Sequence, residues 1–243
     1  MERKKHIIAI ILVLFVLSST ASNKTKIYQA YLNGNMSAWK TTIDEMQEAE
    51  KSVDLRADLL NYQYGYIGWC IGVGNEKEAK TYLKKAEANL ETLEKAEYSA
   101  SEINAYKSAF YGFKIGLSPV RAPFYGPKSV NHAKRAIEIN KTNPMGYIQY
   151  GNSQFFMPPV FGGSKSEAVE YFEKALKLME ISADTLNNWN YLSLLTRIAE
   201  AHQEMGNYES AGMYYKKILQ IEPGFSYVKN ELYPAYLNEI NQK

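Results

Sequence analysis

The feature that most constrains this chain is one helical spacing that recurs along it. A small residue is followed by apolar or aromatic residues three, four and seven positions later, so all four lie on one face of an α-helix. Three clear sets have this spacing: Ala79, Tyr82, Leu83 and Ala86; Ala168, Tyr171, Phe172 and Ala175; and Ala211, Tyr214, Tyr215 and Ile218. Weaker copies are Trp39, Thr42, Ile43 and Met46, and His132, Ala133 and Ala136. Because the small leading residue lets another helix approach closely, the pattern predicts packed pairs of helices.

The sets begin near residues 39, 79, 129, 168 and 211, and are 39 to 50 residues apart. Asn75 and Ser164 each stand three residues before a Glu, as side chains that cap helix N-termini do. Gly74 and Gly163 precede these caps and suit the turns that close the preceding helices. No segment has the alternating pattern of a β-strand. We therefore expect helical hairpins over about 25–48, 54–95, 101–141, 144–180 and 186–221, then a helix over 226–240 that Pro234 interrupts or bends.

Residues 192–223 resemble a tetratricopeptide repeat. Its first helix is matched by Leu195, Ile198 and Ala199, and its second half by Gly206, Tyr208, Ala211, Tyr214, Tyr215, Ile218 and Pro223. That family repeats about every 34 residues, so the longer spacing here indicates a divergent relative with extended connections. The resemblance implies an all-α fold: a right-handed α-α superhelix of about five antiparallel hairpins plus a C-terminal capping helix. It also implies a concave surface that binds extended peptides, which in the last repeat Ser193, Thr196, Glu200 and Gln203 would face.

The first residues have the pattern of an export signal. A basic start with Arg3, Lys4 and Lys5 precedes an apolar run from Ile7 to Leu17 and small residues up to Ala21. Eleven helical residues span about 16 Å, roughly half of a bilayer core. We therefore expect residues 1–21 to be a signal peptide cleaved after Ala21, with an uncleaved anchor as the alternative. Residues 22–243 would then form the repeat domain, periplasmic or secreted, of a bacterial protein without an integral membrane segment after cleavage.

Removing this leader removes Glu2 and three basic residues, which leaves 25 basic and 25 acidic residues. A balanced chain without clustered basic and aromatic residues has no electrostatic footprint for nucleic acid, so we expect no nucleic-acid partner.

Cys70 is the single cysteine, which excludes an intramolecular disulfide. Its apolar neighbours predict a buried, unreactive thiol.

The sequence contains no recognisable catalytic pattern. After the leader the only histidines are His132 and His202, and neither has a metal-binding partner one helical turn away. We expect structural roles for both. Gly72 to Gly74 and Gly162 to Ser166 lack the spacing of nucleotide-binding loops. The sequence therefore predicts neither an enzyme nor a bound metal or cofactor.

Two proline-rich interruptions are the candidate contact region. One covers residues 117–128 and the other residues 152–163, and each joins the first helix of a hairpin to its second. Prolines lack the amide donor, so both first helices must end early, and stacking would place the two connections side by side. The candidate partner-binding residues are Arg121, Phe124, Tyr125, Asn152, Phe155, Phe156 and Phe161. The alternative is that these aromatic side chains only cover the end of the core.

The favoured function is that of an exported, non-enzymatic repeat protein that binds a protein partner or assembles a complex. A second hypothesis is a periplasmic solute-binding or transporter-accessory module. It is based on the segment from Pro158 to Glu167, in which a Pro and Gly-Gly loop precedes a Ser-capped helix. This segment resembles a loop of helical-repeat proteins associated with periplasmic solute transporters.

Overall fold

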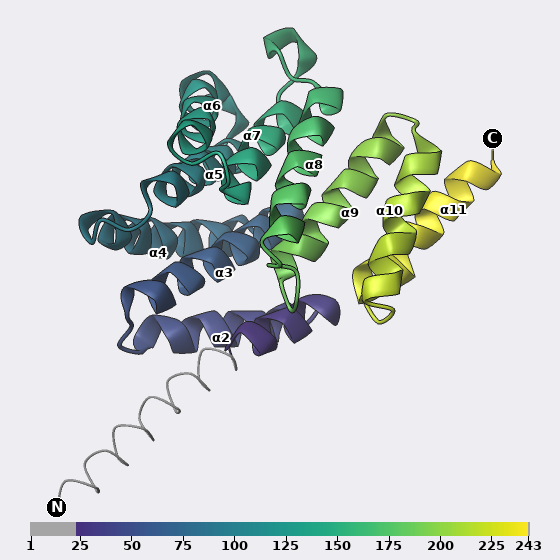
Figure 1. Ribbon diagram of the computed structural model, residues 1–243. Helices are drawn as coiled ribbons and strands as arrows, with labels where there is room; N and C mark the ends of the chain where they lie inside the picture. Colours follow the sequence, from purple (N-terminus) through teal and green to yellow (C-terminus); the bar gives the residue numbers. More distant parts are fainter. Residues whose placement is uncertain (1–22, 243) are drawn as a thin grey trace, which may run out of the picture.

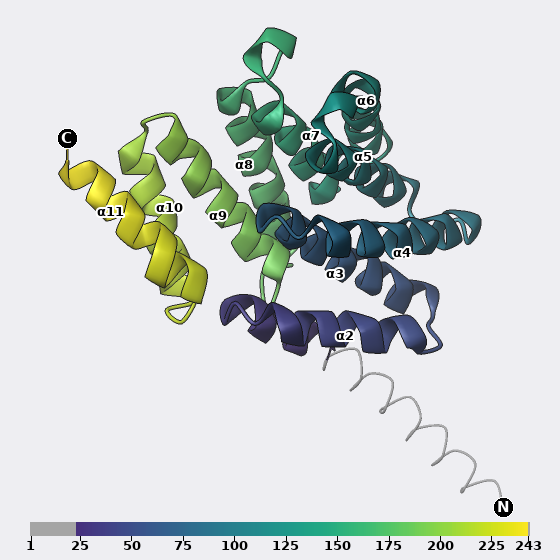
Figure 2. The same ribbon diagram turned by 180° about the vertical axis from the view of Figure 1, so that it is seen from behind.

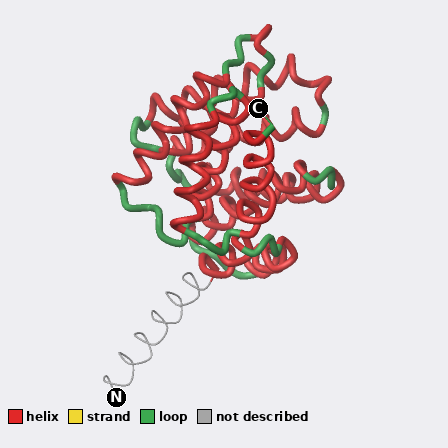
Figure 3. Tube along the Cα trace, turned by 90° about the vertical axis from the view of Figure 1, so that its right-hand side faces the viewer, coloured by secondary structure: helices red, strands yellow, loops and turns green. Residues whose placement is uncertain are grey.

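The computed structural model describes residues 23–242, in which every regular element is helical (Figures 1 and 3). The predicted signal peptide, with its cleavage after Ala21, lies outside the described residues. A first helix covers residues 23–32. It is followed by α2 Met36–Glu48, α3 Val53–Gly72, α4 Glu76–Lys95, α5 Ala100–Leu117, α6 Ala122–Ile139, α7 Pro144–Phe156, α8 Lys165–Ile181, α9 Trp189–Glu204, α10 Tyr208–Ile221 and α11 Tyr233–Asn241. Shorter helical turns are η1 Pro119–Arg121, η2 Pro159–Phe161 and the π-helical η3 Val228–Leu232. The all-α prediction is confirmed.

Consecutive helices pack as antiparallel pairs, and the pairs stack on one another (Figures 1 and 2). The pairs are helix 23–32 with α2, α3 with α4, α5 with α6, α7 with α8, and α9 with α10. In the first pair Lys26 Nζ lies 3.3 Å from Glu45 Oε2. The first helices α3, α5 and α7 also contact one another from pair to pair. The five predicted hairpins are therefore confirmed, and η3 with α11 follows the last of them.

The recurring small and aromatic positions form the core between the helices, and the predicted caps form at their ends. Asn75 Oδ1 accepts a hydrogen bond from the amide of Glu78 at 3.3 Å, and Ser164 Oγ accepts one from the amide of Glu167 at 3.2 Å. These bonds satisfy amides that have no partner inside α4 and α8. In the three clear sets, the fully buried members are Ala79, Ala86, Ala168, Phe172, Ala175, Ala211, Tyr215 and Ile218.

The structure corrects the expected start of one helix. The prolines between 117 and 128 predict a connection without a helix, but α6 already begins at Ala122. Pro123 lies in the first turn of α6, where an amide has no intrahelical acceptor in any case. Pro127 lies inside the helix and removes only one hydrogen bond close to its start. The expected early end of α5, at Leu117, is confirmed, and Pro234 lies in the first turn of α11 directly after η3.

An aromatic cluster joins the two ends of the stack. The rings of Trp39 in α2 and Trp189 in α9 meet edge to face, with centroids 5.1 Å apart. Tyr31 contacts both rings and lies 4.9 Å from Phe225, which follows α10. A β-carbon at Gly65 would lie 2.7 Å from Trp189 and 2.8 Å from Trp39, so only glycine leaves room for both indoles. The helix over 23–32 thus lies beside the segment after α10 (Figures 1 and 2).

A hydrogen bond reinforces this contact between the ends. Tyr28 donates its hydroxyl proton to Glu222 Oε1 at 2.6 Å, across 194 positions of sequence. Burial raises the pKa of Tyr28 well above its ordinary value, and the neighbouring Glu222 carboxylate raises it further. The phenol therefore remains a donor throughout the neutral range.

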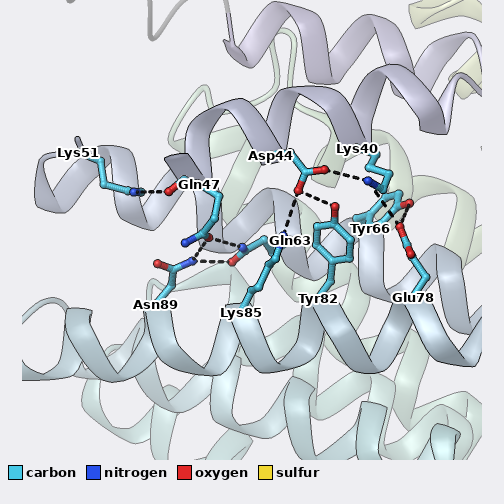
Figure 4. A network of polar contacts seen from close by, with 10 residues as sticks. All are labelled: Lys40, Asp44, Gln47, Lys51, Gln63, Tyr66, Glu78, Tyr82, Lys85 and Asn89. Carbon is cyan, nitrogen blue, oxygen red and sulfur yellow. Dashed lines mark hydrogen bonds and ion pairs between the residues drawn. The ribbon is translucent and has the colours of Figure 1, made fainter. Parts of the chain in front are cut away.

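Polar side chains fill the seam between α2, α3 and α4 (Figure 4). Gln63 donates to Gln47 Oε1 at 3.0 Å, and Asn89 donates to Gln47 Oε1 at 3.0 Å and to Gln63 Oε1 at 2.9 Å. Because Gln63 and Asn89 are buried, these bonds replace the ones that the amides would make with water. The seam therefore fixes how the first two hairpins pack.

Asp44 is the charged centre of this seam. It accepts hydrogen bonds from Tyr82 Oη at 2.6 Å, Lys40 Nζ at 2.9 Å and Lys85 Nζ at 3.2 Å. Partial burial, the largest single influence, favours the protonated acid. The three hydrogen bonds together outweigh it and hold the pKa of Asp44 below its usual range. The ionised carboxylate thus links α2 to α4.

Cys70 is fully buried in α3, and this burial raises the pKa of its thiol to about 11. The prediction of a buried thiol is confirmed, and the protonated thiol is a weak nucleophile at neutral pH.

Among the described residues, no helix has the length and the apolar composition needed to cross a membrane.

We predict that Asp44→Asn lowers the free energy of unfolding by about 1 kcal/mol at pH 7, a modest effect because the side chain is 35% exposed. The native carboxyl has a lowered pKa, so its stabilisation is present above the ordinary value of about 4 and is lost as pH falls through the native pKa. Urea unfolding of both proteins at pH 7 and pH 3 measures this, and the difference should shrink at the lower pH. Glu45→Gln, in an exposed ion pair, is the control and should change stability little.

Candidate functional site

The connection between α7 and α8, which lies at the top of Figure 1, carries large apolar side chains that are exposed. Phe156 is 65% exposed, Val160 83% and Phe161 74%. The backbone around them is fixed by two glycines with different roles. Gly162 has a φ of +93°, so it is the left-handed residue of this turn. A β-carbon at Gly163, where the sequence predicted the turn glycine, would lie 1.7 Å from a backbone oxygen, so Gly163 permits close packing instead.

An arginine from α9 covers the start of this connection. The guanidinium of Arg197 lies 5.3 Å from the ring centroids of both Phe155 and Phe156. Lys165 Nζ lies 5.7 Å from the Phe155 ring. A cation over an aromatic face contributes about 0.5–2 kcal/mol, more where water is excluded. Arg197 Nη1 also lies 3.1 Å from Glu200 Oε2.

Asn152 lies one helical turn before Phe156, on the same side of α7. It donates to Gln149 Oε1 at 3.3 Å, and Gln149 donates to Tyr64 Oη of α3 at 3.1 Å. Burial raises the pKa of the Tyr64 phenol. The nearby charge of Arg197 acts in the opposite direction and lowers this pKa, but burial has the larger effect. We name Asn152, Phe156, Phe161 and Arg197 the aromatic–arginine surface. It can hold an apolar group against the rings while the guanidinium N–H groups that are not paired with Glu200 meet an acceptor.

Phe155 is almost completely buried, unlike the exposed Phe156 that follows it. It is only 9% exposed and packs against Phe172 of α8 with ring centroids 6.5 Å apart. Its ring therefore supports Phe156, which it meets edge to face at 5.0 Å.

The other candidate residues lie around the start of α6. Phe124 is 73% exposed, and Arg121 in η1 is exposed as well. Tyr125 is half-buried, with its ring 5.5 Å from Tyr111 of α5 and Lys114 Nζ 5.7 Å above it. No hydrogen bond, ion pair or ring contact within residues 23–242 joins this group to the aromatic–arginine surface. Of the seven candidates, Phe155 and Phe156 are thus in ring contact with each other, whereas Arg121, Phe124 and Tyr125 contact neither of them.

Arg197 is the residue that sequence reasoning missed. The resemblance to the tetratricopeptide repeat directs Ser193, Thr196, Glu200 and Gln203 to the groove, but Thr196 is buried and donates to Leu192 O at 2.8 Å. Arg197 lies four residues after Ser193 and three before Glu200, so the same helical spacing points to it.

Both histidines stack on a tyrosine ring of a neighbouring helix. His132 Nδ1 is 2.8 Å from Asn104 Oδ1, and its ring stacks on Tyr111. His202 stacks on Tyr214. In the part of the chain that the structure describes, no group of three or more His, Cys, Asp or Glu residues could hold a metal ion.

Comparison with known proteins agrees with this architecture. Residues 192–225, which cover α9, α10 and the turn after them, match the tetratricopeptide repeat model. No curated protein matches the chain. Among solved structures, the HusA haemophore from Porphyromonas gingivalis superimposes with a TM-score of 0.59 and 19% sequence identity, over 76% of this chain and 93% of that chain. At this identity the likeness establishes a shared fold.

We predict opposite outcomes for the two adjacent phenylalanines. Phe155→Ala should lower the free energy of unfolding by about 3 kcal/mol, because it leaves a cavity between α7 and α8. Phe156→Ala should change it by less than about 0.5 kcal/mol, because the ring is mostly in solvent already. Urea denaturation followed by circular dichroism measures both. Equal losses of stability would show that Phe156 is part of the core.

Proposed function

We propose that this protein is a non-enzymatic binding protein that holds an apolar segment of a partner protein on the aromatic–arginine surface. The observation that carries the proposal is the exposure of Phe156 beneath the guanidinium of Arg197. A tetratricopeptide repeat includes Arg197, and such repeats form stacked helical surfaces suited to holding extended chains. Large aromatic side chains and arginine are also the residue types that dominate the energy of protein interfaces.

The rigidity of the site supports this reading. Phe155, Phe172 and the two glycines fix the position of the Phe156 backbone before any ligand arrives. A surface that is ordered in advance loses little conformational entropy on binding. Export to the periplasm or the exterior remains part of the proposal, and it is based on the leader sequence.

We expect Phe156→Ala and Phe161→Ser each to weaken peptide binding at least about tenfold, because each removes exposed apolar contact area without disturbing the fold. Peptides selected from a displayed random library against the full chain provide the probe, and fluorescence polarisation measures their affinity. Leu186→Ser, at an equally exposed leucine between α8 and α9, is the matched control. If the selected peptides bind all three variants as tightly as the unmodified protein, the aromatic–arginine surface is not the binding site.

A second candidate function is the binding of a small, largely apolar solute. It is favoured by the shared fold with a protein described as a haemophore and by the same aromatic rings, which suit a planar ligand. Haem is one such ligand, since its ring could lie against Phe156 while Arg197 meets a carboxylate.

For this second function, haem, organic acids and lipids are added separately, and the melting temperature of the protein is measured. A ligand present at 100 times its Kd stabilises the folded state by about 2.7 kcal/mol, which raises the melting temperature by several degrees. Phe156→Ala should abolish the rise while keeping the ligand-free melting temperature. A rise that survives this substitution would place the solute elsewhere.

A further inference from the structure

Charged residues are segregated along the chain, and α6 lies in the basic part. Between Glu102 and Glu167 there are eight Lys or Arg residues and a single acidic residue, Glu138. This segment covers α5, α6 and α7. The even charge balance of residues 22–243 therefore conceals a strongly basic central region.

Four basic side chains on and beside α6 have no acidic partner. We name Arg121, Lys128, Lys134 and Lys141 the basic face. All four are exposed, and none makes an ion pair or a side-chain hydrogen bond within the described residues. Lys128 and Lys134 each lie 5.6 Å from an aromatic ring, that of Tyr111 in α5 and that of Tyr150 in α7. The positive charge on this side of the protein is therefore not neutralised locally.

Exposed apolar residues stand at the N-terminal end of the same helix. Val120 is 83% exposed and Phe124 is 73% exposed. Three prolines, Pro119, Pro123 and Pro127, alternate with them and carry no amide hydrogen. If this end entered an apolar medium, fewer backbone N–H groups would therefore lose their hydrogen bonds to water.

We propose that the outward side of α6 docks on an anionic lipid surface, with Val120 and Phe124 inserted between headgroups and the basic face against them. Apolar and basic residues thus stand together on η1, α6 and the turn after α6, and this pairing is the pattern of interfacial membrane binding. A bilayer also adapts to protruding side chains, whereas a protein partner would need pockets matched to both. This surface shares no residue with the aromatic–arginine surface, so the inference does not depend on the function proposed above.

Co-sedimentation of the full chain with lipid vesicles tests this inference. The vesicles contain phosphatidylcholine either alone or mixed with phosphatidylglycerol, and residues 1–22 are the same in every variant. We expect binding to the anionic vesicles only, decreasing with added salt. Each basic residue near such a surface contributes about fivefold in affinity. The variant R121Q/K128Q/K134Q/K141Q should therefore bind at least about tenfold more weakly, and V120S/F124S should also lose binding.

Two control variants remove the same charge and the same apolar area elsewhere. K77Q/K84Q/K174Q/K177Q changes four exposed lysines of α4 and α8. I181S/L186S changes the last residue of α8, which is 72% exposed, and a residue of the turn after it, which is 77% exposed. Both controls should bind anionic vesicles like the unmodified protein. The inference is overturned if the controls lose as much binding as the α6 variants, or if no variant differs from the unmodified protein. It is also overturned if the basic face proves to mediate self-association in sedimentation equilibrium while the vesicles do not bind.

Discussion

The contact between Trp39 and Trp189 is the interaction on which the rest of the structure depends. These two rings come from the first and the last hairpin, and they meet over Gly65 of the second. Because Tyr31 and Phe225 extend the same cluster, the position of α9 is fixed relative to α2 and α3. The placement of Arg197 over Phe156 follows from this, since Arg197 lies two turns after Trp189 on the same helix.

The sequence was sufficient for the helical hairpins, because their information is local. Small and aromatic residues at helical spacing, together with caps such as Ser164, determined which segments pair. Proline was less informative. At Pro119 it coincides with the end of α5, whereas Pro123 and Pro127 are accommodated in the first turns of α6. A proline near the start of a helix has little effect, and only the position of that start decides which case applies.

The candidate site could be predicted only in part. Phe156 and Phe161 were expected to form a contact region, and both are exposed, but adjacent residues of one sequence pattern differ in burial, as Phe155 shows. The proposed neighbourhood of Phe156 depends on Arg197, which comes from another hairpin, so no local pattern could reveal the pair. The excess of basic residues between Glu102 and Glu167 is present in the sequence but is hidden by the even balance of residues 22–243, and only the structure shows that Lys128 and Lys134 have no acidic partner among residues 23–242.

The hydrogen bond from Tyr28 to Glu222 has a consequence for how the molecule loses its structure. In an open solenoid each repeat contacts only its neighbours, so the terminal repeats fray independently of the middle. Here the outermost hairpins hold each other, and neither can melt without exposing rings that the other one covers. Unfolding should therefore be cooperative over the whole domain, and deleting a hairpin from either end should abolish the native state rather than shorten it.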